Sequence, residues 1–349
     1  MPKKNITKLS ELPIFKFILI LGVIFIHCNI KDFISSDYTS YGPDIVSFIT
    51  SLMQVCVPSF FIISGYLFFY GVERFTIEIY KKKLSSRFKT LFIPYIIWNS
   101  FCAVLFIIKV FYFNFPGLGI IENDTIHWGK FFEGFIYREQ TGGYPYAFAF
   151  WFIRNLIAFV LLTPIVWLIA RKWWSVILLL AVKFIFDIDF YGIEWFLLGA
   201  SGSIHTIRMD NIKNVPGLML LSGAIYFGLA ILRFWFIENL LIGTLMLYVE
   251  VMAGFCFVYI LSSKLIIFSI TDIGRQLCSS TFFIYAFHQC FCSVTLKFWL
   301  HIIGYDSISK SLFTYILTFL SLFTISFLTY LFVNRFYPKT MRIISGNRA

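Results

Sequence analysis

Residues 15–29 read FKFILILGVIFIHCN, an apolar stretch with one cation near its start, Lys16, and one histidine near its end, His27. The two are 11 residues apart, and at about 100° per residue this spacing is within roughly 20° of three full helical turns. Lys16 and His27 are therefore expected on one helix face, about 16 Å apart along the axis. Ionisable groups in a membrane span usually face a bundle interior or a cavity, and a histidine there can accept a proton near neutral pH. We predict that His27 is the reactive centre and that this helix forms a wall of its site.

The composition is that of a polytopic integral membrane protein. Of 349 residues, 59% are apolar and only 13% are charged, whereas a soluble domain carries about 25% charged residues. The net charge of +11 does not require nucleic acid as a partner, because excess Lys and Arg of membrane proteins collect in cytoplasmic loops. We expect membrane lipid as the surroundings and no nucleic-acid partner. The positive charge also suits an anionic substrate that enters from the cytoplasm.

Ten apolar runs are candidates for transmembrane helices, so the predicted fold class is an all-α membrane bundle. The runs lie near residues 13–30, 45–70, 91–113, 148–169, 173–187, 191–205, 216–233, 239–261, 279–300 and 311–334. The fifth and sixth are shorter than the ~20 residues that usually cross a bilayer, which allows tilted, broken or re-entrant segments. We expect one domain over residues 1–349 and no separate soluble domain.

The basic residues predict the orientation of the bundle. Nineteen Lys and Arg residues fall in the connections on the side of the two termini, and five fall in the connections on the other side. Because basic loops stay in the cytoplasm, both termini are predicted to be cytoplasmic in a multi-pass protein of the cell membrane. Lys16 then lies toward the cytoplasm and His27 toward the outside.

The seven cysteines lie within or beside apolar runs. Their spacing does not pair them with histidines as a zinc site would. We predict that they are small packing residues and that the protein uses no metal.

Two further segments carry candidate site residues. In the second span, Pro58 should kink the helix because it lacks a backbone donor, and Ser64-Gly65 allows close approach of another helix or of a ligand. The basic connection that follows includes Lys83, Arg87 and Lys89. These cations can anchor the cytoplasmic side of the bundle or contact an anionic ligand.

Two ionisable residues lie near the middle of later spans. Glu250 in the eighth span costs a few kcal/mol of insertion free energy if charged, so it is protonated or paired. Lys183 is a candidate structural partner; the alternative is an acid or an orienting group for His27. His288 in the ninth span is either a structural histidine or part of the site.

The longest external connection, residues 114–146, contains Trp128 beside the carboxylates Glu122, Asp124 and Glu133. Aromatic rings beside carboxylates suit sugar binding, and they equally suit the membrane interface. In the fourth span, Trp151 and Arg154 are near the external boundary. Arg154 can reach outward to the interface or face an acceptor substrate.

Five phrases in this order resemble the acyltransferase 3 family of integral membrane acyltransferases. They are Lys16 followed after ten residues by His27, the second-span phrase from Pro58 to Tyr66, Arg87 shortly before Pro94-Tyr95, the fourth-span opening from Trp151 to Leu156, and Tyr285-x-x-His288. The family more often has arginine in place of Lys16. It also has a second arginine where this chain has Thr90.

The resemblance implies an O-acyltransferase that uses acetyl-CoA or a close relative as donor. The phosphates of CoA would meet Lys16, Arg87, Lys89 and Lys83, because arginine binds phosphate through two hydrogen bonds and lysine acts as a point charge. The pantetheine arm would follow the first helix, past a channel wall that includes Ser64 and Gly65.

The resemblance also implies the chemistry and the acceptor. His27 would act as a general base on the acceptor hydroxyl, and an acyl-histidine intermediate is the alternative mechanism. His288 belongs to the matched phrase Tyr285-x-x-His288 and would join the catalytic set. Glu250 is added to that set from its mid-span position alone. The acceptor would be a sugar hydroxyl of a lipid-linked or surface glycan, with Trp151 and Arg154 as substrate-binding residues.

A transporter is the second function class that these residues allow. His27, Glu250 and His288 could relay protons during export of a glycan or a small solute. The absence of recognisable inverted repeats in the sequence weighs against this alternative.

Overall fold

The computed structural model describes residues 9–30, 42–113, 116–122, 125–186, 192–236 and 239–347. The described chain is almost entirely helical, which confirms the predicted all-α fold class. Its longer helices are α1 (Leu12–His27), α2 (Gly42–Leu52), α3 (Cys56–Phe69), α4 (Ile77–Arg87), α5 (Ile93–Phe113), α7 (Trp151–Leu161), α8 (Thr163–Ala170), α9 (Trp173–Phe186), α10 (Ile193–Ile204), α12 (Leu218–Phe236), α13 (Leu240–Lys264), α15 (Asp272–Ile303) and α16 (Ile308–Phe336). The short elements are β1 (Ile121–Glu122), β2 (Thr125–Ile126), α6 (Trp128–Glu133), α11 (Met209–Ile212), α14 (Ile266–Ile270) and α17 (Pro338–Ile344).

Six helical segments of the described chain are long and apolar enough to cross a membrane. They are Asp44–Phe69, Ile77–Phe113, Leu218–Phe236, Leu241–Lys264, Asp272–Ile303 and Ile308–Phe336. The pair Phe148–Leu161 and Thr163–Ala170, bent by 73°, makes a seventh if it is one broken span. Shorter apolar helices occupy the positions of the first, fifth and sixth predicted spans. The predicted multi-pass helical bundle is therefore confirmed, but the predicted count of ten transmembrane helices is not.

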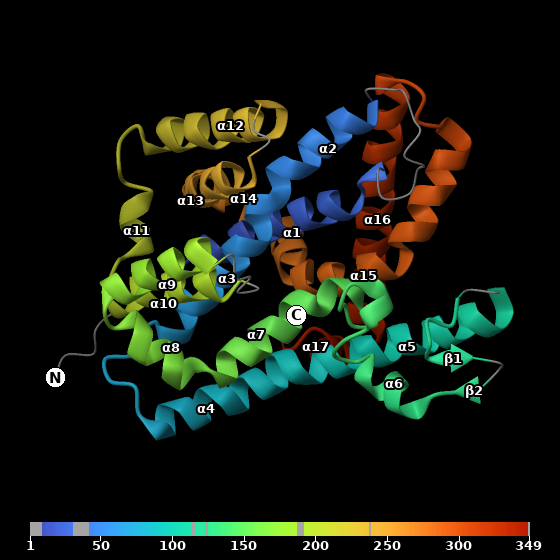
Figure 1. Ribbon diagram of the computed structural model, residues 1–349, viewed down its shortest axis with the longest axis horizontal. Helices are drawn as coiled ribbons and strands as arrows, with labels where there is room; N and C mark the ends of the chain where they lie inside the picture. Colours follow the sequence, from blue (N-terminus) through green and yellow to red (C-terminus); the bar gives the residue numbers. More distant parts are fainter. Residues whose placement is uncertain are drawn as a thin grey trace.

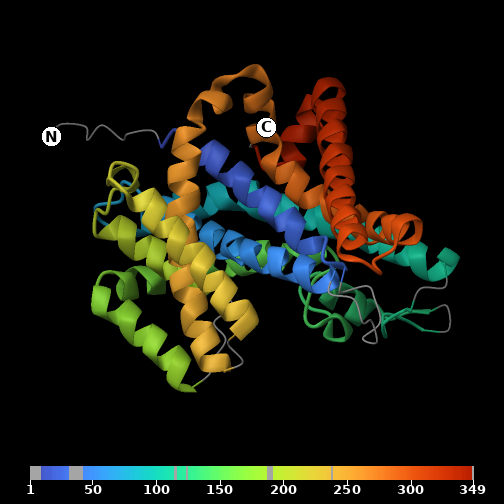
Figure 2. The same ribbon diagram turned by 90° about the horizontal axis from the view of Figure 1, so that it is seen from above.

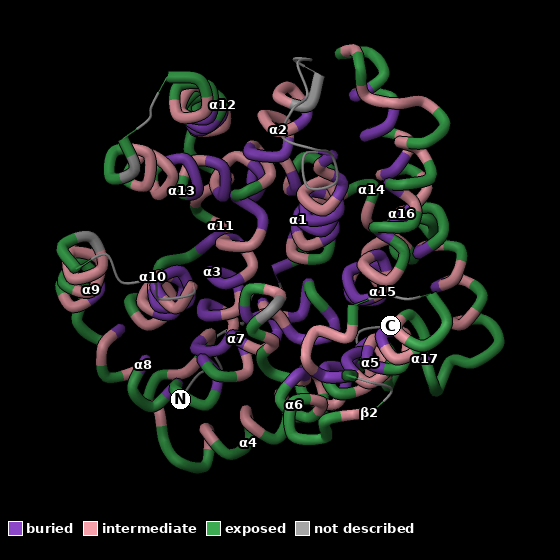
Figure 3. The backbone as a smooth tube through the Cα atoms, turned by 45° about the vertical axis from the view of Figure 1, so that its right-hand side comes forward, coloured by how far each residue is buried: buried purple, intermediate pink, exposed green. Residues whose placement is uncertain are grey.

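Helix α1 runs through the centre of the molecule (Figure 1). Figure 2 shows α13 on one side of it and α15 with α16 on the other. The first turns of α1 pack against α13, where the Phe15 ring lies 5.4 Å from that of Phe255 and 5.7 Å from that of Tyr259. The buried residues concentrate on α1 and its neighbours, whereas the outer helices are largely exposed (Figure 3). Helix α1 has 16 residues and is therefore only about 24 Å long. Packing against the neighbouring helices, which bury half of its residues, holds it in position.

Two glycines bring α3 and α10 into direct backbone contact. A Cβ placed on Gly65 of α3 would lie 2.0 Å from the carbonyl oxygen of Phe196, and one on Gly199 of α10 would lie 1.9 Å from that of Ile62. No side chain fits in either gap. Of the two roles that the sequence allows for Gly65, the structure displays the packing of one helix against another.

The helix geometry changes just before Pro58, where the sequence predicts a kink. The chain passes from α2 into a 3₁₀ turn, Met53–Val55, before α3 begins at Cys56. A proline at position 58 has no N–H for the carbonyl of Gln54 and its ring crowds that carbonyl, so the change of helix geometry falls on the preceding turn.

Ion pairs join α12 to α13 and α9 to α10. Glu250 of α13 accepts hydrogen bonds from Arg233 of α12, at 2.8 Å from Nε and 3.4 Å from Nη2. Lys183 of α9, the partner expected for Glu250, instead contacts Glu194 of α10 at 2.7 Å. The expected pairing was wrong because sequence position does not determine which helices become neighbours; α12 follows α13 along its length, and α9 lies next to α10.

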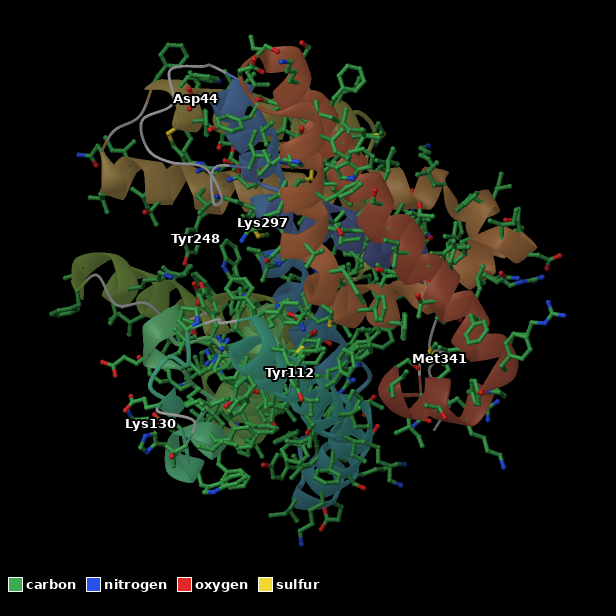
Figure 4. The ribbon with its side chains drawn as sticks, turned by 90° about the vertical axis from the view of Figure 1, so that its right-hand side faces the viewer. Asp44, Tyr112, Lys130, Tyr248, Lys297 and Met341 are labelled. Carbon is green, nitrogen blue, oxygen red and sulfur yellow. The ribbon has the colours of Figure 1, made fainter. Side chains whose placement is uncertain are left out.

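The connection between α5 and α7 includes α6, which lies well away from the C-terminal helix α17. Figure 4 shows Lys130 of α6 and Met341 of α17 at opposite sides of the molecule. Between Ile121 and Ile126 the chain forms the small antiparallel pair β1–β2. Of the carboxylates singled out in this connection, Asp124 is outside the described residues.

Candidate functional site

A cavity of about 600 Å³ lies between α1, α3, α7 and α15. We call it the central cavity. One face of α1 contributes Lys16, Ile20, Val23 and His27 to its lining. This row has the spacing of one helix face, so α1 carries the cation and the histidine to two levels of the same cavity.

Cations from three elements line the end of the cavity at which α1 begins. Lys16 is joined by Arg87, the last residue of α4, and by Arg275 in the first turn of α15. Arg275 also forms an ion pair with Asp272. Sequence reasoning missed Arg275 as a site residue, because in the sequence it is one more basic residue of a connection predicted to be cytoplasmic. Only the packing of α15 along α1 places it at the cavity.

The other two cations of the basic connection lie elsewhere. The ammonium group of Lys83 donates a hydrogen bond to the carbonyl of Phe68 and lies 5.1 Å from the centroid of the Phe68 ring. Lys89 is exposed, outside the cavity lining. Of the four cations expected to meet phosphates, the structure brings together Lys16 and Arg87. Ser64 also lines the cavity, while its neighbour Gly65 faces α10.

His27 ends α1 and lines the opposite end of the cavity. Its ring lies 5.6 Å from the Phe148 ring, edge to face, and 5.3 Å from the His288 ring. Among the residues that the structure describes, none hydrogen-bonds the His27 ring. The backbone of His27 is held in place, because its carbonyl accepts a 2.9 Å hydrogen bond from the Sγ of Cys292. The ring nitrogens are thus available to a substrate.

His288 is fully buried behind His27. Its Nδ1 lies 3.1 Å from the carbonyl oxygen of Ile284. A carbonyl can only accept, so Nδ1 carries the proton and Nε2 of the neutral ring is an acceptor. Within the described part of the chain, Nε2 has no hydrogen-bond partner.

A short turn, Phe148–Phe150, closes the cavity beside His27. Side chains hold its backbone: the Ala149 N–H donates to Gln289 at 2.7 Å, and the Tyr285 hydroxyl donates to the Ala149 carbonyl. The Ala147 N–H donates to Asn99 at 3.0 Å. The wall beside His27 is therefore pre-organised.

The two candidate acceptor residues have different positions. Trp151 lines the central cavity. Arg154 lies outside the lining, and its Nη1 donates 2.7 Å hydrogen bonds to the carbonyls of Ile136 and Gly143. Arg154 thus fastens the connection between α5 and α7 to α7 itself.

Glu250 also lies outside the cavity lining, and its carboxylate is bound by Arg233. The seven cysteines are free thiols. No group of three or more His, Cys, Asp or Glu side chains in the described ranges is arranged to hold a metal ion. The site that remains is a cationic end, an apolar passage and a histidine.

The family model described as an acyltransferase domain, acyltransferase 3, matches residues 9–331. The chain belongs to the acyltransferase 3 family. Neither curated proteins nor solved structures provide a match. The family and the apolar helices together make the protein a multi-pass membrane acyltransferase. The matched residues include every residue of the central cavity named above.

In this acyltransferase, the arrangement suits a donor with an anionic head and a long arm. The cationic end favours phosphate, and the passage from Lys16 to His27 is lined by apolar side chains of α1. The lone pair of a neutral histidine at the far end can take a proton from an attacking hydroxyl.

Proposed function

We propose that this membrane acyltransferase moves an acetyl group from acetyl-CoA to a sugar hydroxyl of a lipid-linked or surface glycan, with His27 as general base. The observation that carries the proposal is that one cavity is lined by Lys16 and Arg87 at one end and by His27 at the other. The O-acetylated glycan and the free thiol of CoA are the products.

The donor would enter at the cationic end. Lys16, Arg87 and Arg275 can bind its phosphates, because charge-assisted hydrogen bonds to phosphate are stronger than neutral ones. The apolar side chains of Ile20 and Val23 suit the pantetheine arm. His27 follows Lys16 by 11 positions along the helix, so the thioester would lie about 16 Å from the cationic end.

The transfer requires one proton to be held and returned. His27 takes the proton of the acceptor hydroxyl while the hydroxyl oxygen attacks the thioester carbonyl carbon. The new C–O bond forms, the C–S bond breaks, and the departing CoA sulfur receives the proton from His27. Direct transfer requires donor and acceptor together on the enzyme, whereas an acyl-histidine intermediate would produce ping-pong kinetics.

The acceptor would approach His27 from the side of Phe148 and Trp151. The Phe148 ring lies edge to face with the His27 ring, Trp151 lines the cavity, and aromatic faces suit the apolar side of a sugar ring. Arg154 supports this approach indirectly by holding the connection between α5 and α7. We assign the reaction to the cell membrane, with CoA on the cytoplasmic side and the glycan on the other.

The relay that a proton-coupled transporter would need is not supported by the position of Glu250. Its carboxylate is paired with Arg233 and lies outside the cavity lining that contains His27. The acyltransferase proposal needs no charge at this position.

The test measures the acetyl content of host surface glycans by mass spectrometry. Strains express the parent chain, His27→Ala, His301→Ala or no protein, at matched membrane levels. His301 is an exposed histidine at the far end of α15, so it controls for the loss of a histidine. We expect acetylation with the parent and with His301→Ala, and none with His27→Ala. Normal acetylation by His27→Ala would refute the site, and a parent that acetylates no glycan would refute the acceptor.

A further inference from the structure

One face of α15 holds the site together. Tyr285, His288, Gln289 and Cys292 are spaced i, i+3, i+4 and i+7, so their side chains leave the helix on the same side. Tyr285 and Gln289 bind the carbonyl and the N–H of Ala149. Cys292 binds the backbone carbonyl of His27. The fourth member, His288, has its ring beside the ring of His27.

Three observations single out His288 within this face. The residue is 0% exposed. Its Nδ1 donates to the Ile284 carbonyl, which leaves a lone pair on Nε2. That Nε2 is a buried atom without a hydrogen-bond partner in the described chain. A buried acceptor left unsatisfied destabilises the fold, so we look for a hydrogen-bond partner that His288 Nε2 gains during function.

We infer that His288 is a positioning residue: its Nε2 accepts the N–H of His27 and leaves the lone pair on the other His27 nitrogen. The inference rests on the proposed function of His27 as base. A histidine ring has two nitrogens, and the hydrogen bond made by one of them decides which carries the proton. With its proton held by His288, His27 presents a lone pair to the acceptor hydroxyl.

The distance between the rings permits this bond. Their centroids are 5.3 Å apart and the ring planes differ by 37°. Nitrogens directed at each other at this separation would be about 3 Å apart, the length of an ordinary hydrogen bond. Catalytic hydrogen bonds are often long before substrate binds and tighten in the complex. The His27 ring is able to turn, because Cys292 holds only its backbone carbonyl and no described residue hydrogen-bonds the ring.

The role explains the phrase Tyr285-x-x-His288. Tyr285 holds the turn that forms the wall beside His27, and His288, one helical turn later, meets the ring of His27 itself. The two residues therefore position the two sides of the same reaction centre.

The test compares His288→Gln with His288→Met in purified full-length protein. The glutamine amide oxygen can accept a hydrogen bond, whereas methionine has similar length and a poor acceptor. Loss of the group that holds the tautomer of a catalytic histidine lowers kcat by up to about 10⁴-fold. We expect His288→Met to lower kcat by about 10²- to 10⁴-fold with KM for acetyl-CoA unchanged. We expect His288→Gln to keep kcat within about tenfold of the parent.

A readout that does not depend on acyl transfer separates this inference from the proposed function. In protein labelled with ¹⁵N-histidine, the His27 ring should show one tautomer in the parent and a mixture in His288→Met. The same tautomer population in both would overturn the inference, and so would equal losses of kcat in the glutamine and methionine variants. Transfer that persists in His27→Ala would instead refute the proposed function.

Discussion

Lys16 and His27 line one cavity from the same face of α1, at two levels separated by three turns of helix. The distance between the cationic end and the base is thus set by a single rigid element. A donor that reaches both must span about 16 Å. This requirement leads to the first prediction.

Removing the cations should weaken donor binding without slowing the chemistry. We expect Lys16→Met, Arg87→Met and Arg275→Gln each to raise KM for acetyl-CoA about tenfold, the effect of losing one charge-assisted hydrogen bond, with kcat within about twofold. Steady-state kinetics on purified protein measures both. Lys172→Met, at an exposed turn between α8 and α9, is the control. We expect Lys89→Met to behave like the control; a tenfold rise there would restore the sequence-based expectation for Lys89.

Gly65→Ala should destabilise the contact between α3 and α10. The new methyl would meet the Phe196 carbonyl at 2.0 Å, and such overpacking costs about 1–3 kcal/mol. We expect a lower midpoint of thermal unfolding in detergent. The matched control is Gly228→Ala in α12, where a Cβ meets nothing within 4 Å and alanine favours the helix. Equal midpoints for the two variants would show that the close backbone contact is not formed.

The pair Arg233–Glu250 should matter for stability and not for transfer. Removal of one member leaves an uncompensated buried charge at a cost of about 3–5 kcal/mol. Glu250→Leu and Arg233→Leu should each lower the thermal midpoint, and the double variant should recover part of the loss. Activity per folded molecule should stay at the parent level. Loss of transfer in a fully folded double variant would return Glu250 to the catalytic set.

Acid should weaken the tie between the start of α1 and the connection before α12. Glu11 is 3% exposed and accepts a hydrogen bond from Lys213. Burial acts to raise the pKa of Glu11, but the hydrogen bond and the charge of Lys213 lower it below its usual value of 4.5. The pKa of Lys213 is raised above its usual 10.5, chiefly by the hydrogen bond to Glu11.

The sign of the pH dependence follows from these two shifts. Because folding lowers the pKa of the Glu11 carboxyl, the pair stabilises the fold at pH values above the carboxyl's unfolded pKa, and this stabilisation disappears as pH falls through the folded pKa. Because folding raises the pKa of Lys213, the stabilisation at high pH disappears only as pH rises above about 10.5. Lys213→Met should therefore cost about 1–3 kcal/mol across neutral pH, and the difference from the parent should shrink below about pH 4.5. Thermal midpoints from about pH 3.5 to 9 measure this, and a constant difference down to the lowest pH would contradict it.

The local features of this protein were predictable from its sequence. Apolar runs of span length mark helices because a bilayer requires every backbone group to be bonded within the segment. The shared face of Lys16 and His27 follows from helical periodicity alone. The phrase Tyr285-x-x-His288 was likewise recognisable in the sequence.

The tertiary structure alone decided which helices meet. Glu250 pairs with Arg233 and not Lys183, Gly65 packs against α10, and Arg275 joins Lys16 across the cavity. Each of these contacts joins residues whose helices are brought together by the packing of the whole bundle. The sequence does not predict which helices become neighbours, because the apolar surfaces of the different helices are alike. The sequence by itself determined a helical membrane protein with a cation and a histidine on one helix face. The tertiary structure decided the rest of the site, because a cavity exists only where several helices fail to fill the space between them.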